Sequence, residues 1–300
     1  MAASPCTDST LKDSLMRRLE DMNASAAQLP VGVCALDSNT QIEFLQAGAP
    51  DQPVSHVLLH GIGSAGASWL EQLEAANRRS HQVPCRVLAW NAPGYGQSTR
   101  LAPEAPVAAD YARRLWQWLD AMGVSQPITL AGQSMGCLIA AAAARQQPQR
   151  IARLVLFAPA RGYGQADPAE RERRRSERLA SLRQHGPSGL AERRAAAMLS
   201  PHASADMVSY VRSIMARVDP LGYAQATEML AQGDIDSDLA SWRGPLIVAS
   251  GSADRITPPE SCRDIAARAG VAWTDLGEVG HGCPLEAAPT ANSLLGLTSE

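Results

Sequence analysis

Ser134 stands between two glycines, in the stretch Gly132-Gln133-Ser134-Met135-Gly136. An apolar run precedes this stretch and an alanine-rich run follows it, which indicates a strand that turns directly into a helix. A turn this tight strains its central residue, and glycines two positions away on either side avoid side-chain clashes. The serine oxygen is then exposed at the carboxyl edge of a sheet, so the sequence predicts that Ser134 is a nucleophile.

A nucleophilic serine needs a base, and the base needs an acid that orients it. In a sheet of this kind the acid and then the histidine follow the serine along the chain. His185 and His202 fall in a helical region, where we expect surface positions, whereas His281 follows the last predicted strand in the loop GEVGHGCP. We therefore predict His281 as the base. Asp254, in the loop after the preceding strand, is the predicted acid, with a purely local loop or N-cap role as the alternative.

The negative charge that develops on the substrate oxygen needs two N–H donors. One is expected from the backbone of Met135, at the start of the helix that follows Ser134. The other is expected from Ile62, in the turn His60-Gly61-Ile62 that ends an apolar strand. For His60 itself we favour a structural role over a catalytic one, because His281 already fills the role of base.

Composition excludes several classes of protein. The chain has 300 residues, a net charge of −3 and 45% hydrophobic residues, so it can bury a large core but offers no basic surface for nucleic acid. We expect no membrane span and no secretory signal, hence a cytoplasmic protein. The six cysteines are scattered without a CxxC pair, so we expect no zinc or redox role for them. The predicted serine mechanism needs no metal and no organic cofactor. We expect a small-molecule substrate as the partner, and we expect the chain to be a monomer or a homodimer.

Apolar strands alternate with helical segments up to residue 160, which predicts a parallel sheet. The alternation stops over residues 161–240, where helix start signals occur at Asp167-Pro168, Ser188, Ser204 and Asp219-Pro220, and it resumes after residue 241. We therefore predict a core of residues 30–160 and 241–300 with a helical lid at 161–240. We expect residues 1–29 to be a helical extension, with an amphipathic helix over 9–23 that packs on the body of the protein.

These motifs, in this order, resemble the α/β-hydrolase fold superfamily: His60-Gly61, NAPGYGQS, GQSMG, GSADRITPP and GHGCPLEA. The resemblance covers residues 31–160 and 241–295. It implies a mostly parallel sheet of about eight strands flanked by helices, with the lid inserted after the sixth strand. Within the superfamily the chain is most similar to the 3-oxoadipate enol-lactonase-like group, through the SMG turn, APARGYG and the segment that leads from the lid to Asp254.

This resemblance implies a serine hydrolase of a small ester or lactone, which could carry a carboxylate. Arg161 would bind that carboxylate, because it directly follows a strand at the edge where ligands bind in such sheets. Two alternatives stay open: a carbon–carbon bond hydrolase with the same three residues, and an inactive fold that binds a ligand. The related carbon–carbon hydrolases usually have tryptophan where this chain has Gly282, which counts against the first. For Cys137 and Cys283 we expect packing roles.

Overall fold

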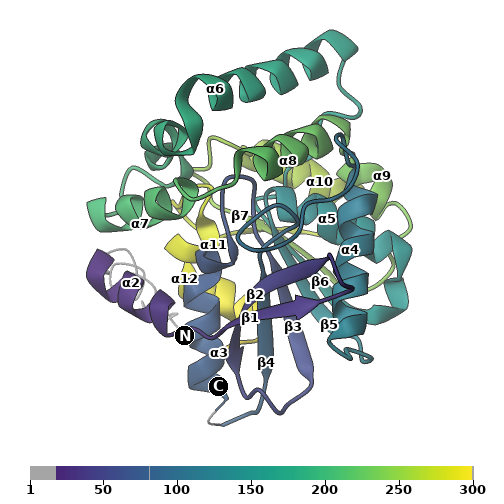
Figure 1. Cartoon of the computed structure of the whole chain (residues 1–300), viewed down its shortest axis with the longest axis vertical. Coiled ribbons are helices and arrows are strands. Elements are labelled where there is room, and N and C mark those ends of the chain that lie inside the picture. The colour runs from purple at the N-terminus through teal and green to yellow at the C-terminus, as the bar shows by residue number, and fades with distance from the viewer. Residues whose placement is uncertain (1–17, 81, 299–300) are drawn as a thin grey trace, which may run out of the picture.

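The computed structural model describes residues 18–80 and 82–298. Within them one sheet has the strand order β1-β2-β4-β3-β5-β6-β7-β8 (Figure 1). β1 and β2, and β2 and β4, pair antiparallel, and every other pair is parallel. The mostly parallel sheet predicted from the sequence is thus confirmed. The strands are β1 (Val31–Ala35), β2 (Gln41–Gly48), β3 (Val54–Leu59), β4 (Arg86–Trp90), β5 (Ile128–Gln133), β6 (Ile151–Phe157), β7 (Leu246–Ser250) and β8 (Trp273–Asp275).

Helices cover both faces of the sheet, and each face has its own apolar core. Successive side chains of a strand point to opposite faces, so Leu154 and Leu156 of β6 enter one core while Val155 and Phe157 enter the other. The first core also contains side chains of α4 (Ala108–Ala121), α5 (Met135–Gln146) and α10 (Pro259–Arg268). The second contains side chains of α3 (Leu70–Arg79), α11 (Cys283–Glu286) and α12 (Ala288–Leu295). Burial on both faces explains why these strands are almost continuously apolar.

The connection from β6 to β7 is helical, as expected. It contains α6 (Pro168–Arg194), α7 (Ala205–Met215), α8 (Pro220–Gln232) and α9 (Ile235–Leu239), and the first three lie across one end of the sheet in Figure 1. Short 3₁₀ turns add η1 (Gly66–Trp69), η2 (Pro148–Arg150) and η3 (Ala196–Met198).

Three of the four helix start signals predicted in this connection act as N-caps. The side chains of Asp167, Ser204 and Asp219 each accept a hydrogen bond from a backbone N–H of the first turn. The fourth, at Ser188, lies two residues past the actual break. α6 instead breaks at Gly186, which has φ 61° and ψ 179°, and its second half begins with Pro187.

The N-terminal helix α2 spans Leu19–Gln28. It contacts α3 and α7, and Met22 is fully buried in the second core. α2 therefore packs on the body, but the predicted bounds are wrong, because Arg18 is extended and the helix begins only at Leu19. Leu11 and Leu15 lie outside the described residues. No helix in the described ranges is long and apolar enough to cross a membrane.

Candidate active site

Ser134 occupies the turn between β5 and α5. Its backbone has φ 54° and ψ −115°, a region that non-glycine residues rarely adopt. A Cβ on Gly132 would lie 2.5 Å from the carbonyl carbon of Gly136, and a Cβ on Gly136 would overlap the carbonyl oxygen of Leu59. Both glycines are therefore required by close packing. They let the turn form and place Ser134 at the N-terminus of α5, where the helix dipole favours negative charge.

His281 and Asp254 meet at the carboxyl end of the sheet, although 27 residues separate them. Nδ1 of His281 lies 2.9 Å from Oδ2 of Asp254, and both side chains are buried. Asp254 also accepts hydrogen bonds from the backbone N–H groups of Ile256 and Thr257, at 2.7 and 3.0 Å. Burial opposes ionisation of Asp254, but the hydrogen bonds from His281 and Thr257 outweigh it and hold its pKa below the usual value. Asp254 can thus stay charged and orient the imidazole.

The two expected oxyanion donors lie beside Ser134. Met135 is the first residue of α5, so its N–H has no acceptor within the helix. Ile62 lines the cavity that contains Ser134, and a Cβ on the preceding Gly61 would lie 3.2 Å from Cβ of Ser134. His60 holds this loop from behind: its Nδ1 lies 2.8 Å from the carbonyl oxygen of Gly61, and its Nε2 accepts the N–H of Ala92 at 3.0 Å. His60 therefore has a structural role.

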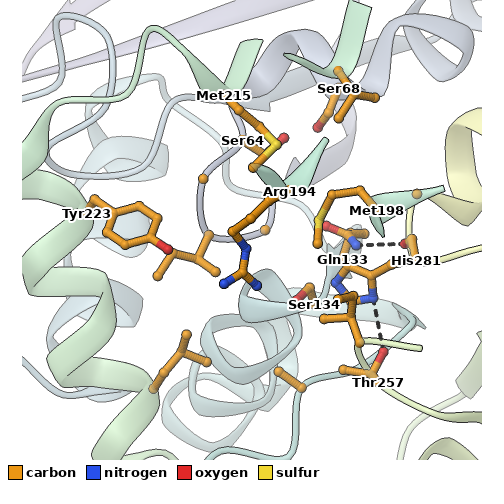
Figure 2. Close-up of a pocket in the computed structure, with 18 of the residues that line it drawn as sticks. Ser64, Ser68, Gln133, Ser134, Arg194, Met198, Met215, Tyr223, Thr257 and His281 are labelled. Atoms are coloured by element: carbon orange, nitrogen blue, oxygen red, sulfur yellow. Dashed lines mark hydrogen bonds between the residues drawn. The ribbon is translucent and has the colours of Figure 1, made fainter. Parts of the chain in front are cut away.

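Ser134 and His281 both line a cavity of about 250 Å³, which Figure 2 shows from within. The carboxyl ends of β3, β5 and β6 and the loop around His281 form its floor. The β6–β7 connection forms much of its wall, through α6, α7 and α8. Apolar residues of that wall are Leu190, Met198, Val211, Met215, Val218 and Leu230. The cavity therefore suits a small substrate with an apolar portion, held over Ser134.

A model of the alpha/beta hydrolase fold family matches residues 57–287. The chain belongs to the alpha/beta hydrolase fold family. The resemblance inferred from the motifs is thus confirmed, and with it the expectation that this protein is an enzyme of the hydrolase class.

Among relatives of this hydrolase, a putative carbamate hydrolase RutD from a Caulobacter species is 26% identical over 79% of this chain and 87% of its own length. The (E)-2-((N-methylformamido)methylene)succinate hydrolase of Acinetobacter baylyi is 29% identical over 41% of this chain, a match that spans only 43% of that relative. Among solved structures, an enol-lactonase from Burkholderia xenovorans has a TM-score of 0.73 at 21% identity, covering 89% of this chain and 99% of its own. Such a distant structural match shows the fold alone.

Arg161 does not have the environment that we expected for a residue that binds a carboxylate of the substrate. It contributes to the cavity wall, but its guanidinium pairs with Asp236 of α9 at 2.6 Å and with Asp264 of α10 at 2.5 Å. Two carboxylates from the protein itself already satisfy this group. Arg161 therefore joins the β6–β7 connection to α10 in this structure, and its binding of a substrate carboxylate stays a prediction.

Two residues that the sequence analysis did not identify fix the geometry around His281. Oγ1 of Thr257 lies 2.8 Å from Oδ2 of Asp254 and 3.1 Å from Nδ1 of His281. Glu286 is fully buried and accepts the N–H of Gly280 at 2.7 Å and that of Ser200 at 2.9 Å. A glutamate within the otherwise apolar segment CPLEAA was the only signal in the sequence for this second residue.

Cys137 and Cys283, which are close in sequence to Ser134 and His281, are fully buried. Burial raises the pKa of each thiol well above its usual value. The Cys137 thiol donates to carbonyl oxygens of the turn, 3.2 Å from Gly132 and 3.4 Å from Phe157. Both cysteines are therefore protonated packing residues and unsuited to act as nucleophiles.

Proposed function

We propose that this protein is a serine hydrolase that cleaves a small ester or lactone through an acyl-enzyme. The observation that carries the proposal is the buried Asp254–His281 pair, at 2.9 Å, in the same cavity as the strained Ser134. Strain of this kind costs free energy and persists where function needs the side chain in that position. The two relatives described above are named as hydrolases, which supports hydrolysis as the reaction class.

In this mechanism Oγ of Ser134 attacks the carbonyl carbon of the substrate and its proton passes to Nε2 of His281. Asp254 holds the proton on Nδ1 and stabilises the imidazolium that forms. The N–H groups of Met135 and Ile62 donate to the oxyanion of the tetrahedral intermediate. His281 then protonates the departing alkoxide. Water, deprotonated by His281, hydrolyses the acyl-enzyme to the free acid and regenerates Ser134.

We further propose that residues 161–240 act as a lid. Their helices cover the floor of the cavity and supply a large part of its wall, so they select the substrate and exclude water from the acyl-enzyme. The remainder of the chain, residues 30–160 and 241–300, supplies all three proposed catalytic residues.

Labelling with a fluorophosphonate probe tests the nucleophile directly. Wild type is expected to react, and Ser134→Ala is expected not to.

On a panel of esters, lactones and carbamates, Ser134→Ala or His281→Ala should lower kcat by about 10⁴- to 10⁶-fold, because these residues act as a unit. Asp254→Asn should lower it by up to about 10⁴-fold, since the wrong imidazole tautomer results. Near-normal turnover by Ser134→Ala, with wild-type contamination excluded, would refute the mechanism.

The two alternative functions give different results in the same assays. A carbon–carbon bond hydrolase would consume a ring-fission dienone and leave the esters untouched. An inactive ligand-binding fold would not react with the fluorophosphonate. Related carbon–carbon hydrolases usually have tryptophan where this chain has Gly282, so we favour ester or lactone hydrolysis.

A further inference from the structure

Two arginines of α6, Arg178 and Arg194, line the cavity above Ser134. Sixteen residues separate them, which is about 24 Å along a straight helix. The break at Gly186 lies between them and turns the second half of α6, so that both side chains reach the same cavity. Figure 2 shows the guanidinium of Arg194 directed into this space, with Tyr223 on one side and Ser134 and His281 on the other.

Neither arginine has an acidic partner among the residues that the structure describes. Some other arginines of the β6–β7 connection do form ion pairs with carboxylates, among them Arg161, which also lines the cavity. The described lining of the cavity also contains no aspartate or glutamate. Arg178 and Arg194 therefore give the cavity positive charge that no carboxylate of its described lining neutralises.

Arg194 is also partly removed from water. Its side chain is half-buried, and burial lowers the pKa of its guanidinium; Tyr223 raises that pKa, the nearby charge of Arg178 lowers it, and the net direction is downward. A cation is costly to desolvate without a counter-charge. An unpaired arginine kept in a cavity beside a second one is thus suited to receive an anion from outside the protein.

We propose that Arg194, with Arg178 beside it, binds a carboxylate on the acyl portion of the substrate. This inference rests on the proposed hydrolase function and names its substrate class: monoesters or lactones of short dicarboxylic acids. The planar guanidinium can form two parallel hydrogen bonds to a carboxylate, which fixes its orientation. The apolar wall, including Leu190 and Met198, contacts the carbon chain, and the second carbonyl of the substrate then lies over Ser134. Hydrolysis with one water gives a dicarboxylate and, from an ester, an alcohol.

Binding of the product to an inactive variant tests this inference without any turnover. In the Ser134→Ala background, calorimetry would measure the affinities for succinate, glutarate and adipate, and for their uncharged dimethyl esters. We expect at least one of the dicarboxylates to bind more tightly than its dimethyl ester. Adding Arg194→Met should weaken that binding by about 10- to 100-fold, the usual effect of losing one charged hydrogen-bonded partner. Arg194→Lys should restore part of the affinity.

Two further variants make the result interpretable. Arg193→Met is the matched control, because Arg193 is the adjacent arginine of α6 but is exposed and does not line the cavity; it should bind as the parent does. Arg178→Met should also weaken dicarboxylate binding. It replaces Arg194→Met in the test if Arg194→Met does not fold. The inference is overturned if no dicarboxylate binds, if the dimethyl esters bind equally well, or if Arg193→Met has as large an effect as Arg194→Met.

The outcome is separable from that of the hydrolase proposal. Arginine-dependent binding of a dicarboxylate together with no turnover of any ester, lactone or carbamate would reject the hydrolase function and keep the anion site. Turnover of neutral esters that Arg194→Met leaves unchanged, with no dicarboxylate binding, would reject the anion site and keep the hydrolase function.

Discussion

At the scale of single residues, three possible nucleophiles, Ser134, Cys137 and Cys283, differ in what surrounds them. Ser134 lines the cavity, whereas both thiols are fully buried and have raised pKa values. We predict that iodoacetamide under native conditions leaves ester hydrolysis unchanged and that a fluorophosphonate abolishes it. Mass spectrometry of the treated enzyme would identify the modified residue. Loss of activity in step with alkylation of Cys137 or Cys283 would contradict this prediction.

The identities of Ser134, Asp254 and His281 could be inferred from sequence because each follows a strand, and parallel strands bring their carboxyl ends to one edge. Arg161 follows a strand in the same way, yet the groups that its guanidinium contacts could not be inferred. The carboxylates that bind it come from Asp236 and Asp264, 75 and 103 residues further along the chain. Position at a strand end places a residue near the site, but only long-range packing decides which group its side chain contacts.

At the scale of elements, the strands and the helices of the core were predictable because their apolar periodicity is local. The course of the β6–β7 connection could not be predicted, because the sequence does not show which faces of its helices turn toward the cavity. For this reason the role of Arg194 could not be predicted from the sequence. Arg194 lines the cavity while its neighbour Arg193 is exposed, and the break at Gly186 sets the direction of this half of α6. Glu286 was missed for the same reason, since its partner Ser200 lies in that connection.

Glu286 links the His281 loop to the connection after η3, and its removal should show how much that link contributes. In Glu286→Gln one carboxylate oxygen becomes an NH₂ group that faces a backbone N–H, of Gly280 or of Ser200. We expect a loss of about 1–3 kcal/mol in the free energy of unfolding, the cost of a buried unsatisfied donor. Urea denaturation would measure it.

Glu278→Gln is the matched control, because Glu278 is in the same loop and its side chain is 84% exposed. It should change the free energy of unfolding by less than about 0.5 kcal/mol, as surface substitutions usually do. Equal stabilities of Glu286→Gln and Glu278→Gln would show that the two hydrogen bonds to Glu286 contribute nothing net.

At the scale of the whole molecule, two buried histidines connect parts of the fold that are distant in sequence. His56 of β3 contacts the carbonyl oxygen of Leu295 at the end of α12, 2.9 Å from its Nε2. His60 holds the loop of Gly61 against the segment that follows β4. Burial lowers the pKa of each to about 4, so both are neutral in the folded protein at pH 7.

These pKa values make the folded state sensitive to acid in a definite window. In the unfolded chain a histidine titrates near 6.5, so below that pH the unfolded state binds protons that the folded state does not. Stability is therefore fully present above pH 6.5 and falls as the pH approaches 4. The loss amounts to about 3 kcal/mol for each histidine across the window, from a pKa difference of roughly 2.5.

Urea denaturation of wild type, His56→Gln and His60→Gln at several pH values between 7 and 4 would test this. Each variant is expected to be less stable than wild type at pH 7 and to show a shallower decline toward pH 4, because one titrating group is absent. Carboxylates such as Asp254 and Glu286 also titrate in acid, but they do so equally in wild type and variant, so the difference in slope isolates the histidine. His202→Gln is the control, since that side chain is 65% exposed. The His202→Gln control should follow the wild-type slope. If His56→Gln and His60→Gln follow that slope as well, burial does not keep these two histidines neutral.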